Sequence, residues 1–105
     1  MDKGEALKIA NQYLDKVSSI YVVLQAYMIG SFAKGTNHAD SDIDIALVVK
    51  NVSDIIDTQI ELMKMRRNVD LRIEPHPFVI NDFNSDNPVV NEILTSGIPI
   101  KIPEA

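Results

Sequence analysis

Cysteine is absent from this 105-residue sequence. The protein can therefore form neither a disulfide nor a thiolate zinc site, and it has no thiol nucleophile. We expect neither a signal peptide nor a membrane span, because the first residues are charged and the longest apolar segment is too short to cross a bilayer. We expect a cytoplasmic protein that does not interact with membranes.

Positive charge is scarce: 10 lysines and arginines stand against 15 aspartates and glutamates, for a net charge of −5. Proteins bind long nucleic acids mainly through lysines and arginines that neutralise phosphates, so a long nucleic-acid substrate is disfavoured. The length suits one domain with a single core and leaves no room for a second lobe. We expect a single domain over residues 1–105, without a separate acceptor-binding domain. The sequence is compatible with a homo-oligomer.

Hydrophobic periodicity predicts a small α+β domain with three helices and about four strands. The first helix is predicted over residues 3–17, the second from a Ser53 cap to about residue 65, and the third from an Asn87 cap and Pro88 to Gly97. The predicted strands span about 22–29, 42–49, 69–74 and 98–102. The last should lie at an edge of the sheet, because Pro99 cannot donate a ladder hydrogen bond.

Each helix is expected to bury one apolar stripe, and the third predicted strand one face. In that strand, apolar residues alternate strictly with charged ones, and two prolines end it before a loop at 78–86 that should cover one side of a cleft. The expected buried residues are Val52, Ile56, Ile60 and Met63 in the second helix, Val89, Val90, Ile93 and Leu94 in the third, and Val69, Leu71 and Ile73 in the strand before Pro75 and Pro77.

One short stretch combines a small-residue turn with a pair of acids between two apolar runs. Gly30 has no Cβ, so a phosphate can approach the backbone, and Ser31 can cap a following turn whose N–H groups bind anions. Strand alternation puts the carboxylates of Asp42 and Asp44 on one face and Ile43 on the other. Magnesium binds through one or two carboxylates together with substrate phosphates. The stretch therefore predicts a site for a metal-bound nucleoside triphosphate.

The two halves of this stretch form a specific pattern. Gly30-Ser31 is followed after ten residues by Asp42-Ile43-Asp44, with Gly35 and Ser41 also in place. Either half alone is common, but both at this spacing, each at the end of an apolar strand, are specific. The pattern resembles the signature of the minimal nucleotidyltransferases of the DNA polymerase β superfamily. The resemblance covers roughly the whole chain and implies a polymerase β-like fold, a small mixed sheet with flanking helices.

The resemblance implies transfer of a nucleoside monophosphate from ATP to a hydroxyl, with release of pyrophosphate and catalysis by two Mg²⁺ ions. Asp42 and Asp44 would bridge the two ions. Asp70 would bind the catalytic ion and help to remove the proton of the acceptor hydroxyl, and it falls near the other acids if its strand lies beside theirs. The predicted nucleotide-binding residues are Gly30, Ser31, Lys34, Gly35 and Ser41.

The resemblance also suggests a partner protein. Chains of this size with this signature are similar to the antitoxin halves of two-gene modules, which add AMP to a helical HEPN-domain ribonuclease toxin. Two alternatives stay open: a binding module that neutralises its toxin by contact with a vestigial nucleotide site, and an aminoglycoside-type transferase. The intact acids Asp42, Asp44 and Asp70 disfavour the first. The second is disfavoured because the sequence offers no second domain to hold a drug.

A calcium loop is a competing interpretation of the acids. Asp40, Asp42 and Asp44 alternate as they do at the start of an EF-hand loop. The sixth position of that loop would be Ile45 instead of glycine, and the twelfth would be Asn51 instead of glutamate. We therefore disfavour a calcium site.

Four other charged or titratable residues have both structural and functional interpretations. His38 and His76 are isolated in predicted loops, which favours solvated or structural roles over metal binding. Lys34 is either a phosphate contact from the turn or a solvated surface charge. Arg72 either contacts the triphosphate or pairs with a neighbouring acid of its own strand, and the ion pair is favoured.

Overall fold

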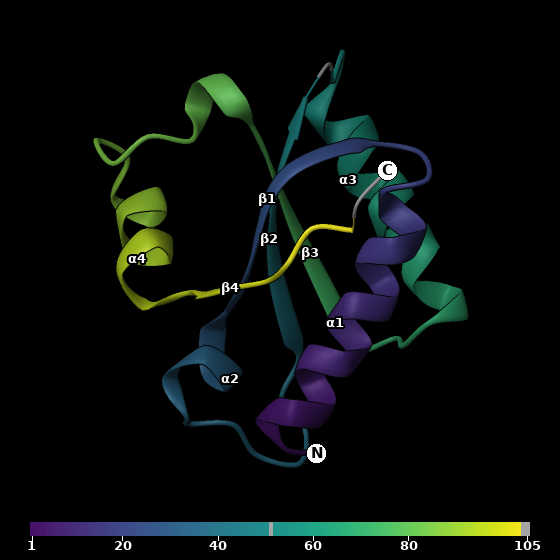
Figure 1. Cartoon of the computed structure of the whole chain (residues 1–105), viewed down its shortest axis with the longest axis vertical. Coiled ribbons are helices and arrows are strands. Elements are labelled where there is room, and N and C mark those ends of the chain that lie inside the picture. Colours follow the sequence, from purple (N-terminus) through teal and green to yellow (C-terminus); the bar gives the residue numbers. More distant parts are fainter. Residues whose placement is uncertain (51, 104–105) are drawn as a thin grey trace.

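The computed structural model describes residues 1–50 and 52–103 and shows a mixed sheet at the centre of the molecule (Figure 1). Its strands in these residues are β1 (Val22–Ile29), β2 (Ile43–Lys50), β3 (Ile73–Val79) and β4 (Ile98–Pro99), in the order β3-β2-β1-β4. β1 is antiparallel to both β2 and β4, whereas β2 and β3 are parallel. The predicted α+β fold with a small mixed sheet is confirmed.

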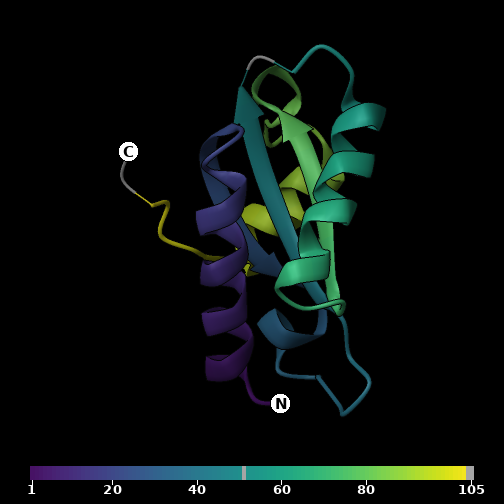
Figure 2. The ribbon, with the colours of Figure 1, turned by 90° about the vertical axis from the view of Figure 1, so that its right-hand side faces the viewer.

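The helices lie on both faces of the sheet. α1 (Lys3–Val17) and α3 (Ile55–Met65) cover one face, and α4 (Pro88–Ser96) lies on the other side (Figure 2). A short helix, α2 (Gly30–Lys34), follows β1, and 3₁₀ turns follow α3 at Arg66–Asn68 and β3 at Ile80–Asp82. No helix in the described residues has the length and apolar character of a membrane span.

Local sequence signals account for the ends of these helices. Asp2 begins α1 by accepting a hydrogen bond from the backbone N–H of Glu5, at 2.8 Å. Asn87 begins α4 in the same way, followed by Pro88 at the first helical position and Gly97 at the end. The bounds of both helices agree with the predictions.

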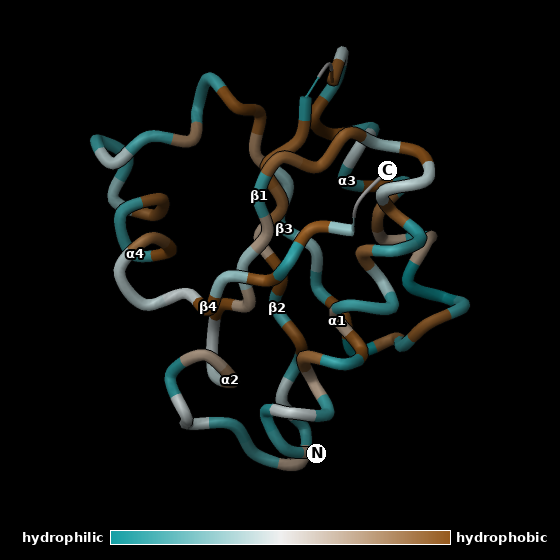
Figure 3. Tube along the Cα trace, viewed as in Figure 1, coloured by the Kyte–Doolittle hydropathy of each residue, from teal (hydrophilic) through white to brown (hydrophobic). Residues whose placement is uncertain are grey.

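β2 runs through the centre of the core. Ile43, Ile45, Leu47 and Val49 are fully buried with residues of α1 and with Leu62 of α3. The hydroxyl of Tyr13 in α1 donates a hydrogen bond of 2.6 Å to the carbonyl of Leu62, which satisfies a buried polar group between the two helices. The loop after α2 and the loop that leads into α4 are hydrophilic (Figure 3).

The third strand begins and ends later in the chain than predicted. The predicted strand at 69–74 is wrong: residues 69–72 form a turn, Leu71 is exposed, and β3 begins at Ile73. Pro75 and Pro77 lie inside the strand instead of ending it, because β3 is an edge strand and their missing N–H groups would point away from β2. On that outer edge, α3 and the 3₁₀ turn after it supply the partners: Gln59 of α3 donates to the carbonyl of Pro75, and Arg66 of the turn to that of Ile73.

Two predicted helical stripes also need correction. Asp54, not Ser53, caps α3 by accepting hydrogen bonds from the N–H groups of the first helical turn. α3 packs through Thr58 and Leu62, because it approaches the sheet with the side opposite to the predicted stripe. The predicted buried residues Ile56, Ile60, Val89 and Leu94 are exposed, and Val52 and Met63 are only partly buried.

The last strand is shorter than predicted. β4 has two residues instead of the expected span 98–102, and it pairs with Tyr27 and Met28 of β1. Its place at the edge of the sheet agrees with the prediction.

Candidate active site

Gly30 and Asp44 meet where β1 ends and β2 begins. The antiparallel register pairs Ile29, the last residue of β1, with Asp44. Gly30 has a φ of 72°, which favours glycine, and a Cβ on it would collide with Oδ2 of Asp44 and lie 3.2 Å from its Cγ. The missing side chain therefore makes room for the carboxylate itself. The two halves of the sequence pattern are in direct contact.

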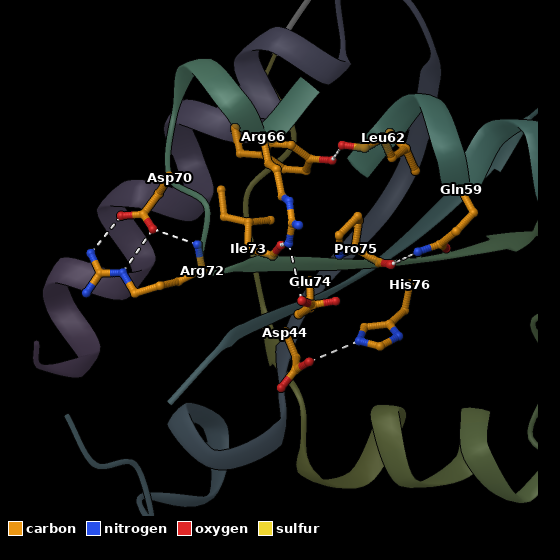
Figure 4. A network of polar contacts seen from close by, with 11 residues as sticks. Asp44, Gln59, Leu62, Arg66, Asp70, Arg72, Ile73, Glu74, Pro75 and His76 are labelled. Carbon is orange, nitrogen blue, oxygen red and sulfur yellow. Dashed lines mark hydrogen bonds and ion pairs between the residues drawn. The ribbon is translucent and has the colours of Figure 1, made fainter. Parts of the chain in front are cut away.

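The second oxygen of Asp44 faces the third strand. His76 places its Nε2 3.0 Å from Oδ1 of Asp44 (Figure 4). Glu74 is level with Asp44 in the parallel register, and alternation along β3 puts Glu74 and His76 on the same face of the sheet as Asp44. Arg66 binds Oε1 of Glu74 at 3.2 Å from the edge of the sheet. Asp44 thus lies between Gly30 and His76, with Glu74 on the same face of the sheet.

Glu74 and His76 are not among the site residues predicted from the sequence. Both follow from the β2–β3 register, which the sequence does not contain. The alternation of Glu74 with Ile73 and Pro75 is the signal in the sequence for the face on which Glu74 lies. It extends to His76 only if the predicted strand continues through Pro75 and Pro77. The interpretation of His76 as a solvated loop residue is wrong in its location, since His76 lies in β3 and contacts Asp44.

Asp70 lies in the turn before β3 and is held by Arg72. The carboxylate accepts hydrogen bonds from the backbone N–H, Nε and Nη2 of Arg72, at 2.9, 2.9 and 2.7 Å (Figure 4). These bonds to the Arg72 side chain hold the pKa of Asp70 below its usual value. Of the two interpretations of Arg72, the structure shows the ion pair. Asp70 is outside the strand that runs beside Asp44.

Asp42 is exposed immediately before β2, and Ile43, which separates it from Asp44, is fully buried. The preceding loop is folded around Ser41, whose buried hydroxyl accepts a 2.8 Å hydrogen bond from the backbone N–H of His38. The N–H of Ser41 donates back to the carbonyl of His38, at 3.0 Å. The observed contacts of Ser41 therefore fix the loop that presents Asp42.

The turn formed by α2 is closed at its far end. Gly35 has a φ of 75° and donates its N–H to the carbonyl of Ser31, as glycine commonly does after a helix. Lys34 forms a 2.8 Å salt bridge with Glu92 of α4, which raises the pKa of Lys34 and lowers that of Glu92. A cavity of about 170 Å³ lies between α2 and α4 and reaches Gly30. Lys34 thus lines this cavity and is connected to α4 by its salt bridge with Glu92.

The carboxylates of this site suit a hard divalent cation whose other ligands are phosphate oxygens of the substrate. Asp42, Asp44 and Glu74 offer carboxylate oxygens, the ligands that magnesium prefers. Within residues 1–50 and 52–103, no group of three or more histidine, aspartate or glutamate side chains is positioned to hold a metal ion. Magnesium usually binds through one or two carboxylates and substrate phosphates instead of a cage made by protein alone. The space left by Gly30 beside Asp44 suits that arrangement.

Comparisons with known proteins agree with this geometry. The sequence matches the family described as polymerase beta, nucleotidyltransferase, over residues 8–103. No protein of curated function matches significantly.

Three solved structures share the fold. A candidate nucleotidyltransferase from Sulfolobus solfataricus is 23% identical, with 76% of this chain and 72% of that chain covered and a TM-score of 0.63. A toxin-antitoxin structure with AMP-PNP is 21% identical, with 90% and 74% covered and a TM-score of 0.63. A mutant of the toxin-antitoxin MntA-HpeT is 18% identical, with 99% and 76% covered and a TM-score of 0.57.

Proposed function

The chain belongs to the polymerase β nucleotidyltransferase family, and on this basis we propose that it transfers a nucleoside monophosphate from ATP to a hydroxyl group, with release of pyrophosphate. The observation that best supports this proposal is the packing of the Asp44 carboxylate against Gly30. It brings an acid that can bind metal to the start of the turn that can bind phosphate. Neither half of the site would have this chemistry alone.

Each part of the site has a proposed task. Asp42 and Asp44 would hold magnesium, with two ions expected for this reaction, and the metal would neutralise phosphate charge and activate the acceptor hydroxyl. The turn at Gly30 and Ser31 would bind the outer phosphates through backbone N–H groups. Gly35 and Ser41 would preserve the shapes of the turn and of the loop before Asp42. His76 would orient Asp44 through the bond to Oδ1.

A third carboxylate is expected at the site, and two acids compete for the place. The family resemblance assigns it to Asp70, which lies in the turn before β3 and is engaged by Arg72. Glu74 is also bound by an arginine, Arg66, but it lies inside β3 and is level with Asp44 in the sheet. We therefore propose Glu74 as the third acid and retain Asp70 as the alternative.

Glu74→Gln should lower the rate of nucleotidyl transfer by about a hundredfold or more, the scale observed when a group that stabilises transition-state charge is removed. Asp70→Asn should lower it much less, because its carboxylate would serve only the turn that precedes β3. Both variants remove one negative charge from the same segment, so they are matched. The reverse order of the two effects on kcat would return the role to Asp70.

The acceptor is proposed to be a partner protein. Positioning two reactants contributes about 7–11 kcal/mol to barrier reduction, so an acceptor must be held firmly. We assign the described elements to the core and to the site for the nucleotide donor. An acceptor that is itself a folded protein would bring its own surface for binding to this chain. Two of the similar structures are toxin-antitoxin structures, one of them with AMP-PNP. We propose that this chain is an antitoxin that adds AMP to a hydroxyl of a HEPN-domain toxin.

This proposal can be tested with the protein encoded by the neighbouring gene. The purified chain, magnesium, ATP and that protein are mixed, and the intact mass of the neighbour is followed. An increase by one AMP is expected, and it should disappear with Asp44→Asn.

Two other outcomes would contradict the proposed acceptor. If the Asp44→Asn variant neutralises the neighbour as well as the parent does, and no AMP is added, the chain acts as a contact inhibitor. If the isolated chain labels a small molecule such as an aminoglycoside, or tRNA, and leaves the neighbour unlabelled, the acceptor is not the partner protein.

A further inference from the structure

α3 carries a second apolar side that points away from the core. Ile56 and Ile60 are 68% and 49% exposed, and Met63, partly exposed, continues the stripe at helical spacing. Leu71, 66% exposed in the turn after the helix, lies at the C-terminal end of the same surface. Because Thr58 and Leu62 already anchor the opposite side of α3, the fold leaves this stripe uncovered. We call these four exposed or partly exposed residues the α3 stripe.

The stripe ends in a hollow. A concave surface of about 290 Å³ is lined by the apolar residues Ile60, Met63 and Leu71 together with Gln59, Lys64, Arg66 and Arg67. Ile56, the most exposed residue of the stripe, lies at the other end of the helix. The surface thus has a protrusion at one end and a recess at the other.

The charges along the stripe are also divided between its ends. Asp57 and Glu61 follow Ile56, whereas Lys64 and Arg67 come later in the chain. In the described part of the chain, no salt bridge involves any of these four residues; Glu61 accepts a hydrogen bond from Tyr21. Acid at one end and base at the other make the surface complementary to a copy of itself in the opposite direction.

We propose that two copies of the chain pair through antiparallel contact of their α3 stripes, with a two-fold axis near Ile60. Positions equally far from Ile60 then meet, so Ile56 of each copy faces the segment with Lys64 and the hollow of the other. Asp57, three residues before Ile60, faces the segment of Met63 and Lys64 in the other copy, so its carboxylate comes close to the Lys64 ammonium. Each pair of contacts occurs twice, as an isologous interface requires.

The location of the stripe favours a second copy over an acceptor protein. α3 covers the sheet face opposite α4 (Figure 2), whereas Asp44, Glu74 and His76 share the other face. The stripe is the exposed side of α3. An acceptor hydroxyl has to reach those three residues on the other face. Pairing through α3 leaves that face open in both copies.

Sedimentation equilibrium of the purified chain tests the pairing. The parent should be a reversible dimer, and Ile60→Glu should weaken the dimer by at least about tenfold, because it buries a charge at the two-fold axis. Leu94→Glu is the matched control: it places the same charge on an exposed leucine of α4 and should leave the dimer unchanged.

Charge reversal identifies the geometry. Asp57→Lys and Lys64→Asp should each weaken the dimer, and the double variant should restore it, since the reversed charges again face each other. Circular dichroism establishes that each variant is folded. A parent that remains monomeric at about 1 mM would overturn the proposal. So would a dimer that Ile60→Glu does not affect, or a double variant that is weaker than both single variants.

Discussion

Replacing Asp44 by asparagine should abolish the stabilisation of the protein by magnesium and ATP together, while the fold is preserved. Selective binding to the folded state adds about 2.7 kcal/mol of stability when the ligand is present at about one hundred times its Kd. Asp44 joins the phosphate turn to the proposed metal ligands through its contact with Gly30, so its charge should be needed for the joint effect. Thermal melting with magnesium, ATP, both and neither measures it.

Two further variants make this measurement specific. Asp42→Asn should behave like Asp44→Asn. Asp40→Asn removes the same charge from an exposed residue of the same loop and should keep the full response. If Asp44→Asn responds to magnesium and ATP as the parent does, the nucleotide site lies elsewhere.

Gly30→Val should abolish the binding of both metal and nucleotide. From the sequence alone, Gly30 only lets the phosphates approach the backbone. If that were its whole role, Gly30→Val would leave metal binding intact. The structure changes the expectation, because a Cβ at this position would displace the Asp44 carboxylate. The positive φ of Gly30 adds backbone strain of about 1–2 kcal/mol for a side-chain-bearing residue. Isothermal titration with manganese, as a probe for magnesium, and then with ATP measures the two affinities separately.

The strain needs its own control. Gly35→Ala introduces a side chain at the same φ in open space, so it measures the stability cost of the backbone conformation alone. Gly30→Val should lose more stability than Gly35→Ala in urea denaturation. A folded Gly30→Val variant that binds manganese normally would show that Gly30 does not position Asp44.

The elements with local signals could be predicted from the sequence. α1 has a capping aspartate and a regular apolar stripe, and β1 and β2 are apolar runs with a glycine or an aspartate at their ends. The alternation at 69–74 predicts a strand, but residues 69–72 form a turn in which Asp70 is held by Arg72, and β3 begins only at Ile73. What permits two prolines inside β3 is its place at the edge of the sheet, and strand order is a property of the whole fold.

The same distinction applies to the site. Gly30, Ser31, Asp42 and Asp44 lie in one short stretch, so their spacing was enough to recognise the pattern. Contacts that depend on strand register were beyond the sequence, namely those of Asp44 with Gly30, with His76 and with its neighbour on β3. The apolar stripe of α3 was visible in the sequence, but periodicity cannot tell a side that faces the core from one that faces outward.

The most direct test of nucleotidyl transfer is the fate of the individual phosphates of ATP. The chain is incubated with magnesium, the neighbouring gene's protein and ATP labelled either on the α-phosphate or on the γ-phosphate. Label from the α-phosphate should become covalently attached to the acceptor, and label from the γ-phosphate should appear in free pyrophosphate, both only while Asp44 is intact. Attachment of the γ-label instead would mean phosphoryl transfer, and would contradict the reaction proposed for this site.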